Sequence, residues 1–378
     1  MLKMAYMVEE KGLEAHPDKT AYIVIKGNKK NVIMMEKELE NNPLRFGKHF
    51  TMTRRKEDRY LGQQLHEDRT AASVASTVAR RTGRFKGASF EIRSVIEEFS
   101  MAALAGMMAA KVLLERALLP SLLSGACNWI GMRKDTEEQC DDLIYMYWRV
   151  MFKVPDGTPN IALIAETATL RTKWRVWEAK VMLVKRLQSQ DITSLARMVY
   201  EEQLRLGWPG LAEEVKKICS EVGLPDVNLI EVKKEKVKEM IYYHHYKDIK
   251  EQIQRSSKLD KIKHEDFRKA QSYMEDRSID RCRTKFWIRT EMMKTFKDNF
   301  RSKYRERERG DEEDDPGLQC KDCSEPRSPD SQAHCLRCPA WEHIRTGLDL
   351  EDIEDVITYF QRVLEGRDEK ARRRKKDE

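Results

Sequence analysis

The sequence predicts a mainly α-helical protein with a short α+β segment at the N-terminus and a small cysteine-rich module near the C-terminus. Strand-like patterns are confined to the chain before residue 70. From about residue 68 onward, stretches rich in Ala, Leu, Met, Glu, Lys and Arg alternate with Pro and Gly, which is typical of successive helices. Four cysteines then gather within residues 320–338. A chain of 378 residues has room for about two or three domains.

The N-terminal segment combines a strand pattern with an amphipathic helix. Residues 20–25 are rich in β-branched and aromatic side chains and lie between turn-forming residues, so they are expected to form a strand. Residues 30–39 place apolar side chains near the helical period, and this helix should end before Pro43. A second short apolar run occupies residues 60–62.

The helical array that follows is divided by Pro and Gly. We expect breaks at Pro120 and at residues 155–159, 207–210 and 223–225. Aromatic residues recur on these helices and are expected to pack in the core, namely Tyr145, Tyr147, Trp148, Trp174, Trp177 and Tyr200. The neighbouring histidines His244 and His245 point in different directions on a helix, so we expect surface or half-buried rings and no shared metal ion.

A strongly basic helix is predicted over residues 280–304. Its apolar positions form one stripe, which comprises Cys282, Phe286, Met293, Phe296 and Phe300. Basic residues lie beside this stripe at steps of four, namely Arg281, Lys285, Arg289 and then Lys297, Arg301 and Arg305. Such a helix can bury one face and place the other along a phosphate backbone without contacting bases. A solvated helix on a bundle has the same pattern, so both interpretations stay open.

The net charge of +7 is concentrated in one segment of the chain. Residues 281–309 carry eleven basic and four acidic residues, so the remainder is close to neutral. Five consecutive acids follow at 311–315, and residues 370–376 form a basic run. Basic clusters of this density attract polyanions, and the C-terminal run also fits a nuclear-import signal. Solvated helix faces and disordered ends are the alternative interpretation.

Two further basic patches lie nearer the N-terminus. The first comprises Arg45, Lys48, Arg54, Arg55, Lys56 and Arg59, opposed by Glu57 and Asp58. The second comprises Arg80, Arg81, Arg84, Lys86 and Arg93, opposed by Glu91. Both patches suit contacts with phosphates, although ordinary solvated surface would have the same composition.

Membrane and secreted classes are not supported by the sequence. The most apolar window, residues 101–127, is interrupted by three charged residues and a proline, so no membrane span is expected. The N-terminus lacks a cationic segment followed by an apolar run, so we expect an intracellular protein, cytoplasmic, nuclear or both. P-loop, GxSxG and HExxH patterns do not occur, which disfavours an independent enzyme.

The cysteines fall into two groups. Those scattered over helical patterns are expected to be reduced, buried small residues, namely Cys127, Cys140, Cys219 and Cys282. The others follow the pattern Cys320-x2-Cys323 and His334-Cys335-x2-Cys338, which offers five donors at the spacing of a closed, structural zinc site.

Two ligand sets fit this spacing. Cys320, Cys323, His334 and Cys338 would place the last two donors one helical turn apart on one face. In the second set Cys335 replaces His334, and two CxxC turns face each other. We favour the set with His334, while a disulfide or unliganded thiols are the remaining alternative.

Four motifs occur in a definite order along most of the chain. They are GLEAHPDKT at 12–20 with the strand after it, KEDRYLG at 56–62, ALLPSLL at 117–123 and QAHCLRCPAW at 332–341. Together they resemble the C-terminal part of the reverse transcriptase of non-LTR (LINE-type) retrotransposons. The corresponding parts of that family are the palm strand after a loop lysine, the YLG hairpin between palm and thumb, the thumb with its connector, and the C-terminal zinc knuckle.

The resemblance implies five segments. These are a palm remnant at 1–66, a thumb-like domain at 67–155, a connector with the basic helix at 156–310, a zinc knuckle at 311–346, and a terminal helix with a basic tail at 347–378. It also implies that Lys19 lies near an incoming triphosphate and that residues 60–62 abut the primer end. With the basic positions, the predicted nucleic-acid-binding residues are Lys19, Arg54, Arg55, Tyr60, Leu61, Gly62, Arg80, Arg81, Arg84, Lys285, Arg289, Lys297 and Arg301.

The family's catalytic acids are missing from this sequence. Its polymerases hold two Mg²⁺ ions with an upstream Asp and a Tyr/Phe-x-Asp-Asp loop, and no such loop occurs here. The adjacent acids at 141–142, 312–313 and 314–315 are expected to be solvated carboxylates.

We therefore expect a fragment that binds RNA or DNA mainly through phosphates and does not polymerise by itself. It would hold structural Zn²⁺, and Mg²⁺ only if an upstream palm is supplied. The alternative is a non-enzymatic helical scaffold that binds a protein and uses the zinc knuckle as a structural clip.

Overall fold

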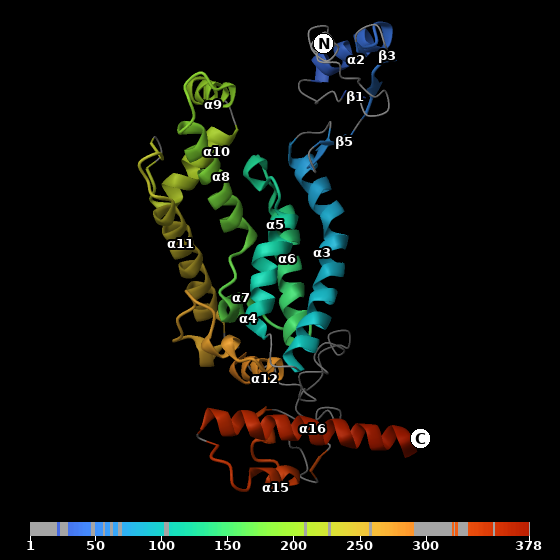
Figure 1. Ribbon diagram of the computed structural model, residues 1–378, viewed down its shortest axis with the longest axis vertical. Coiled ribbons are helices and arrows are strands. Elements are labelled where there is room, and N and C mark those ends of the chain that lie inside the picture. Colours follow the sequence, from blue (N-terminus) through green and yellow to red (C-terminus); the bar gives the residue numbers. More distant parts are fainter. Residues whose placement is uncertain are drawn as a thin grey trace. The chain divides into compact units, whose positions relative to one another are not determined.

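The computed structural model is mainly α-helical in its described part, as the sequence predicts (Figure 1). The described residues are 21–22, 29–46, 50–55, 57–60, 63–66, 70–101, 106–207, 210–225, 228–256, 259–290, 320, 322–323, 332–350 and 352–377. The chain divides into two compact units. The first comprises Met1–Arg84, Pro120–Cys140 and Arg175–Val237, and the second comprises Phe85–Leu119, Asp141–Trp174 and Lys238–Glu378.

Several long helices contribute residues to both units. They are α3 (Thr70–Met101), α6 (Lys134–Phe152), α8 (Thr172–Gln188) and α11 (Lys234–Arg255). The units therefore interleave along the sequence, whereas the five segments expected from the family resemblance are contiguous. The boundaries of those segments stay predictions.

Short strands form part of the first unit near the N-terminus. β1 (Ala21–Tyr22) pairs in parallel with β4 (Thr53–Arg54), and β2 (Arg45–Phe46) pairs antiparallel with β3 (Phe50–Thr51). Of the strand predicted over residues 20–25, the described part is β1, and its other residues lie outside the described ranges.

A hairpin and a helix complete the described N-terminal part. β5 (Glu57–Tyr60) pairs antiparallel with β6 (Gln63–His66), with Tyr60 opposite Gln63. Helix α2 (Lys29–Asn41) confirms the helix predicted over residues 30–39. The predicted α+β character of this segment is therefore present.

The helical part of the first unit includes α9 (Leu195–Leu206) and α10 (Leu211–Val222). The helices end at Gly207 and Gly223, whose φ angles of 62° and 72° are left-handed values that favour glycine. The predicted breaks at these two positions are confirmed. Helix α10 buries apolar side chains one turn apart, namely Leu211, Val215, Ile218 and Val222.

Helix α10 is also fixed to its unit by a buried cation. Lys180 of α8 is only 5% exposed, and its Nζ lies 2.5 Å from Glu214 Oε2 of α10. The other carboxylate oxygen of Glu214 accepts a 2.6 Å hydrogen bond from the Gly131 N–H. Because both carboxylate oxygens have partners, the charge of Lys180 is neutralised where water is excluded.

The chain does not break at Pro120, contrary to the prediction. Helix α4 (Met107–Leu113) continues through a π-helical segment (Leu114–Leu118) into α5 (Leu119–Leu122). Proline lacks an N–H and its ring collides with the carbonyl four residues earlier in a regular α-helix. The wider π turn just before Pro120 provides the space, so the helix continues. Within the described residues, no helix is both long and apolar enough to cross a bilayer.

Aromatic side chains form the core of the second unit. The Phe152 and Phe286 rings stack with centroids 4.0 Å apart, and Trp148 lies 5.7 Å from Phe152. The polar groups of two of these side chains have hydrogen-bond partners. Tyr147 donates its O–H to Ala110 O (2.6 Å), and Trp148 Nε1 donates to Thr169 Oγ1 (3.0 Å). The core role predicted for the helical aromatics is confirmed for Tyr145, Tyr147, Trp148, Trp174 and Tyr200, while Trp177 is half-buried.

Helix α12 (Ile279–Thr290) is the described part of the predicted basic helix, and it is buried more completely than its sequence indicates. Cys282 and Phe286 are fully buried, as the apolar stripe predicts. Arg283 is also only 1% exposed, although it carries a charge. Its guanidinium lies 2.5 Å from a Glu97 carboxylate oxygen and donates to Met151 O at 2.8 Å. Helix α12 therefore joins the core on more than one face.

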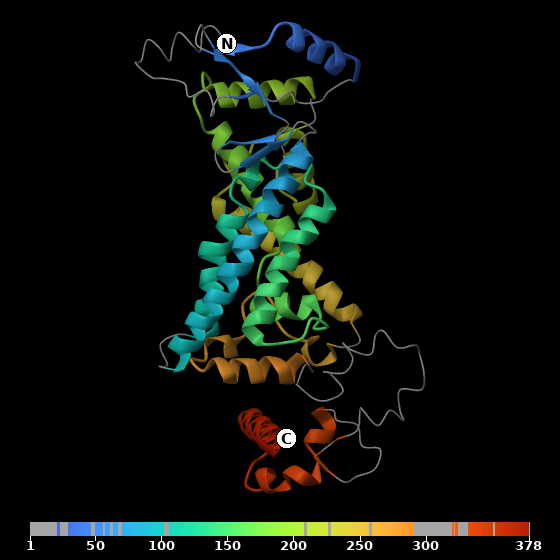
Figure 2. The same cartoon turned by 90° about the vertical axis from the view of Figure 1, so that its right-hand side faces the viewer.

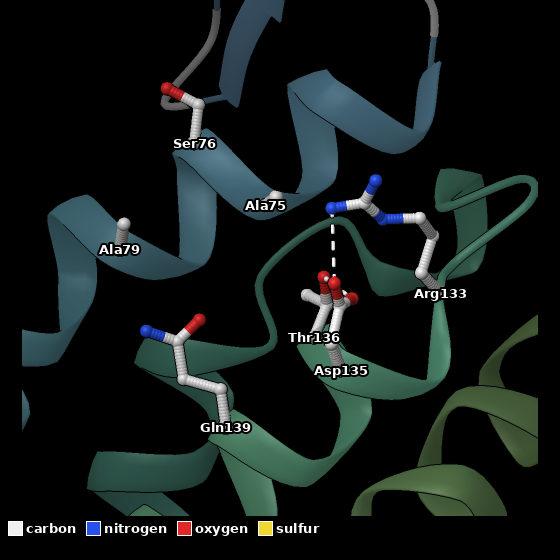
Figure 3. Close-up of a pocket in the computed structure, with 7 residues that line it drawn as sticks. All are labelled: Ala75, Ser76, Ala79, Arg133, Asp135, Thr136 and Gln139. Atoms are coloured by element: carbon white, nitrogen blue, oxygen red, sulfur yellow. Dashed lines mark hydrogen bonds and ion pairs between the residues drawn. The ribbon is translucent and has the colours of Figure 1, made fainter.

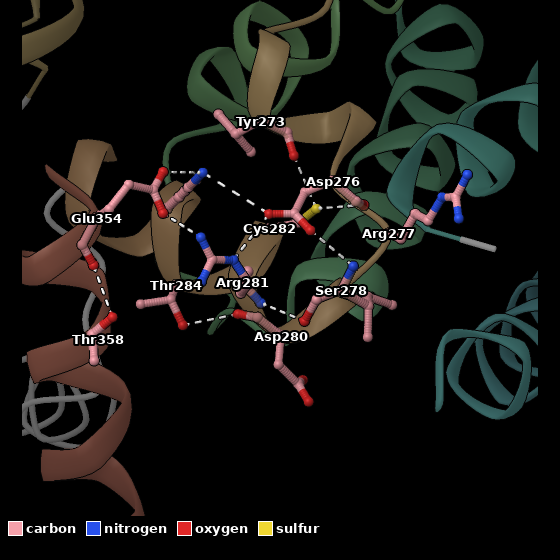
Figure 4. Close-up of polar contacts among 12 residues, drawn as sticks. Tyr273, Asp276, Arg277, Ser278, Asp280, Arg281, Cys282, Thr284, Glu354 and Thr358 are labelled. Atoms are coloured by element: carbon pink, nitrogen blue, oxygen red, sulfur yellow. Dashed lines mark hydrogen bonds and ion pairs between the residues drawn. The ribbon is translucent and has the colours of Figure 1, made fainter. Parts of the chain in front are cut away.

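A C-terminal module contacts α12 within the second unit. Its helices are drawn in red in Figure 2. It comprises α14 (Gln332–Cys335), η8 (Pro339–Trp341), α15 (Glu342–Arg345) and α16 (Ile353–Asp377). Glu354 of α16 forms ion pairs with Arg281 and Lys285 of α12, the latter at 2.8 Å (Figure 4).

Within this module α16 lies against Trp341. A Cβ added at Gly366 would lie 2.8 Å from the Trp341 ring, so only glycine allows the helix to approach the indole.

Candidate metal centre and cationic surfaces

Four side chains in the C-terminal module bring their ligand atoms together. Cys320, Cys323, His334 and Cys338 place three sulfurs and one imidazole nitrogen within 4.8 Å of one another. His334 lies in α14, and Cys338 is the residue that precedes the 3-10 turn η8. Because α14 ends at Cys335, the last two donors are not on one continuous helix, yet they reach the same point. This Cys₃His group could hold a metal ion and is the ligand set favoured from the sequence.

The distances in the group fit a tetrahedral ion of the size of zinc. Bonds of about 2.3 Å to sulfur and 2.0 Å to nitrogen place two sulfurs about 3.8 Å apart and a sulfur and a nitrogen about 3.5 Å apart. The Cys320 and Cys338 sulfurs are 3.8 Å apart, and Cys323 Sγ lies 3.4 Å from His334 Nε2. Burial raises the pKa of the Cys338 thiol to about 12, so a thiolate there requires a compensating cation.

Cys335 is held away from this group by two residues of α16. The Tyr359 O–H donates to the Cys335 carbonyl, and Arg367 donates to its sulfur at 3.4 Å. Arg367 is fixed in turn by Asp322, with Nε 2.7 Å from a carboxylate oxygen. Cys335 therefore serves the packing of α16 and lies outside the four-ligand group. The sequence left this choice open because α16 follows the cysteines and its contacts cannot be inferred from spacing.

The predicted nucleic-acid-binding residues are described to different extents. Lys19, Leu61, Gly62, Lys297 and Arg301 lie outside the described residues. Arg54 and Tyr60 lie in β4 and at the end of β5, and only their backbone is described. Arg55 is half-buried, and Arg80 and Arg84 are exposed on α3. Phosphate binding by each of these residues stays a prediction.

Arg81 has a different environment from its two basic neighbours. Its guanidinium donates to the carbonyls of Leu122 and Ser124, at 2.8 and 2.9 Å. A cation at these carbonyls compensates the negative end of the preceding helix. Arg81 therefore stabilises the chain around α5, while Arg80 and Arg84 are exposed on α3.

A shallow hollow lies between α3 and the segment that begins at Arg133, within the first unit (Figure 3). It has a volume of about 410 Å³ and is lined by small side chains of α3 and by the start of α6, namely Ala75, Ser76, Ala79, Arg133, Asp135, Thr136 and Gln139. Arg133 lies 3.0 Å from Asp135 across this wall. Arg133 is not part of any basic patch in the sequence, because only folding brings it beside α3.

Lys285 and Arg289 contact carboxylates within the second unit. Lys285 pairs with Glu354 at 2.8 Å. Arg289 Nε lies 3.0 Å from Oε2 of Glu166, and Glu166 is fully buried. Burial raises the pKa of Glu166, although Arg289 opposes that shift. Glu265 adds a second ion pair to Arg289, at 3.1 Å. Phosphate contact by Lys285 or Arg289 stays a prediction, and it would have to compete with these carboxylates.

Two polar residues on the helical array are more buried than predicted, since Asp141 was expected to be solvated and His245 to lie at the surface or half-buried. Asp141 is only 7% exposed, and its carboxylate accepts a 2.8 Å hydrogen bond from the Thr172 N–H at the start of α8. Burial therefore raises its pKa, although this hydrogen bond lowers it. His245 is 4% exposed, and its Nε2 lies 3.4 Å from the Arg171 N–H. Both side chains cap the N-terminus of α8, and Asp142 is exposed as expected.

Comparison with known proteins identifies no relative of this chain. No family model matches the sequence, and no curated protein or solved structure has significant similarity to it. The resemblance to non-LTR reverse transcriptases therefore depends on the four sequence motifs.

Proposed function

We propose that this chain binds nucleic-acid duplexes through phosphates, as the C-terminal part of a non-LTR reverse transcriptase would, and that its Cys₃His group holds a structural Zn²⁺. The observation that carries the proposal is the exposed cationic face of α3, where Arg80 and Arg84 lie one helical turn apart. The sequence contains no Tyr/Phe-x-Asp-Asp loop, so the chain is expected to bind without polymerising.

The shape of this face suits a phosphate backbone. Side chains at i and i+4 start about 5–6 Å apart, so two guanidinium groups can contact neighbouring phosphates of one strand. Gly83 lies beside them, and a Cβ added there would meet no atom within 4 Å. The missing side chain allows close approach of the helix backbone to a ligand. The expected contacts are with phosphates and therefore independent of base sequence.

The proposed zinc ion would have a structural role. With all four positions filled by protein donors, the site has no open position for catalysis. Bound zinc would neutralise the thiolates and join residues 320–323 to residues 332–338. Trp341 and α16 pack beside these donors, so the ion would also order the module that contacts α12.

Binding to a short duplex tests the proposal on α3. Fluorescence anisotropy with labelled DNA duplex and RNA–DNA hybrid should show binding by the wild type at low ionic strength. The double variant Arg80→Gln/Arg84→Gln should bind about 10- to 100-fold more weakly, because two charge-assisted contacts are lost. The control is Arg197→Gln/Arg205→Gln on α9, which removes the same net charge from another helix of the first unit.

Equal losses in the two double variants would show that only net charge matters and would contradict a site on α3. No binding to either duplex at low salt would contradict the nucleic-acid function altogether, and it would favour the helical scaffold.

A further inference from the structure

Helix α11 has an exposed face on which tyrosines and lysines lie together. Tyr243, Tyr246, Lys247 and Lys250 occupy positions i, i+3, i+4 and i+7, so they share one side of the helix. Tyr243 is 58% exposed, Lys247 and Lys250 are exposed, and Tyr246 is half-buried. All four belong to the second unit. A tyrosine exposed to this extent has much of its ring accessible to a ligand.

The Tyr243 ring is supported from one side. His244 contacts it edge-on, with ring centroids 5.6 Å apart and planes at 83°. The His244 ring lies 6.4 Å from that of Trp174, which is only 4% exposed and therefore anchored in the core. The tyrosine is thus held by a ring contact at its edge while much of its surface faces solvent. A flat ring that is already oriented loses little entropy when another ring stacks on it.

Cations surround these rings. Lys250 Nζ lies 5.9 Å from the Tyr246 ring centre, and the Arg268 guanidinium lies 5.7 Å from it. Lys173 at the start of α8 lies 4.7 Å from the Trp174 ring centre. Lys269 is exposed next to Arg268. Positive charge therefore comes from three elements of the second unit.

Acidic groups near this face have basic partners of their own. Asp248 pairs with Arg171, Glu251 lies 3.5 Å from Arg255, and Asp266 lies 2.8 Å from Arg268. The hydrogen bonds from Arg268 lower the pKa of Asp266 to about 2, so that pair stays ionised near neutral pH. Glu239, one turn before Tyr243, is a further acid on this side of α11. The local balance is cationic at Lys247 and Lys250.

We propose that this face of α11 binds single-stranded RNA or DNA, with a base stacked on Tyr243 and phosphates at Lys247 and Lys250. The inference deepens the proposed nucleic-acid function and rests on it, because it assigns single strands to a surface distinct from the duplex-binding face of α3. Base faces are accessible in single strands and covered in a duplex, so a stacking ring selects the single strand. A patch for an apolar protein surface would carry aliphatic side chains, whereas these four positions carry two rings and two cations.

Anisotropy measurements with labelled oligo(U) and oligo(dT) of about 20 nucleotides, on the full-length zinc-loaded chain, test this proposal. Tyr243→Ala should weaken single-strand binding about 5- to 150-fold, the range for loss of one base–aromatic stack. Tyr243→Phe keeps the ring and should bind like the wild type. The matched control is Tyr242→Ala, because Tyr242 is 43% exposed and points about 100° away around the same helix.

Lys247→Gln/Lys250→Gln should reduce the slope of log K against log salt by about 1.4, since each phosphate contact to a single strand contributes about 0.7. If circular dichroism shows that Tyr243→Ala does not fold, the salt slope of the lysine variant still tests whether this face of α11 binds single strands. Unchanged single-strand binding in both the Tyr243 and the lysine variants would overturn the inference.

The outcomes separate the two proposals. Duplex binding that persists without any single-strand binding would overturn the α11 site and leave the α3 site standing. Loss of duplex and single-strand binding together in Tyr243→Ala, with the fold intact, would contradict a surface specific for single strands. A wild-type chain that binds neither would contradict both proposals.

Discussion

Single side chains determine which donors form the metal group. Five donors lie at zinc-ligand spacing in the sequence, and the structure selects four because Tyr359 and Arg367 hold Cys335. The type of site could be predicted, since the CxxC and His-x3-Cys patterns are local. The set without Cys335 was already favoured from the sequence. The contacts that hold Cys335 could not be predicted, because Tyr359 and Arg367 lie 24 and 32 residues further along the chain.

Zinc content should distinguish the four ligands from Cys335. We expect about one equivalent of zinc in the purified wild-type chain, a large loss in Cys338→Ser, and no loss in Cys335→Ser, because only the first change removes a ligand. Atomic emission measurements on the intact protein give this directly. Equal loss in the two variants, or less than half an equivalent in the wild type, would contradict the assignment.

Gly366 is expected to tolerate no side chain. In Gly366→Ala the new Cβ would lie 2.8 Å from the Trp341 ring, so α16 must move or the indole must rotate. We predict a loss of about 1–3 kcal/mol in the stability of the C-terminal module, measured by hydrogen exchange of its amides.

Gly87→Ala on α3 is the matched control for Gly366→Ala. A Cβ added at Gly87 meets no atom within 4 Å, so helix propensity should stabilise α3 by about 0.5–1 kcal/mol. A stabilising effect of Gly366→Ala would show that the contact with Trp341 is not tight.

At the level of elements, amino-acid composition and the spacing of apolar residues predict where helices form. Ion pairs between residues far apart in the sequence determine which face of each helix is buried and which is exposed. The breaks at Gly207 and Gly223 follow from glycine's access to positive φ and were predictable. The continuation through Pro120 depends on a π turn that no sequence pattern announces. Of the cationic positions predicted on α12, Arg281 and Arg289 pair with carboxylates 73 and 123 residues away.

Arg283→Met tests the role of the buried ion pair on α12. The change leaves Glu97 with Lys153 at 3.0 Å and Arg93 at 3.9 Å as ion-pair partners, and we expect a loss of about 3 kcal/mol in the free energy of unfolding. Chemical denaturation monitored by tryptophan fluorescence measures this loss. Lys153→Met, which removes a 40% exposed lysine from the same carboxylate, should cost much less.

The pH dependence of this pair has a definite sign. Burial raises the pKa of Glu97, but hydrogen bonds from Lys153 and Arg283 outweigh it and hold the pKa below 4.5. A lowered pKa contributes stability above pH 4.5, and that contribution is lost as pH falls through the folded-state pKa. The stability difference between wild type and Arg283→Met should therefore shrink below pH 4.5. A constant difference from pH 7 to pH 3 would contradict the pairing.

For the whole molecule, the distribution of charge is more informative than its sum of +7. Arg283, Lys285 and Arg289 belong to the basic segment at 281–309, and within the described residues their charges meet internal carboxylates. The exposed cations of the proposed sites lie elsewhere, on α3 and α11. The mainly α-helical class could be predicted because it depends on composition and period. The locations of cationic surfaces could not, because ion pairs between distant residues decide which charges remain at the surface.

The salt dependence of duplex binding by the wild-type chain tests the central claim most directly. If Arg80 and Arg84 each neutralise a phosphate, the plot of log K against log salt should fall with a slope of about −1.8 or steeper. Titration of a labelled DNA duplex at several salt concentrations, by anisotropy, gives this slope. A slope near zero, or no binding at low ionic strength, would contradict phosphate binding as the function of this protein.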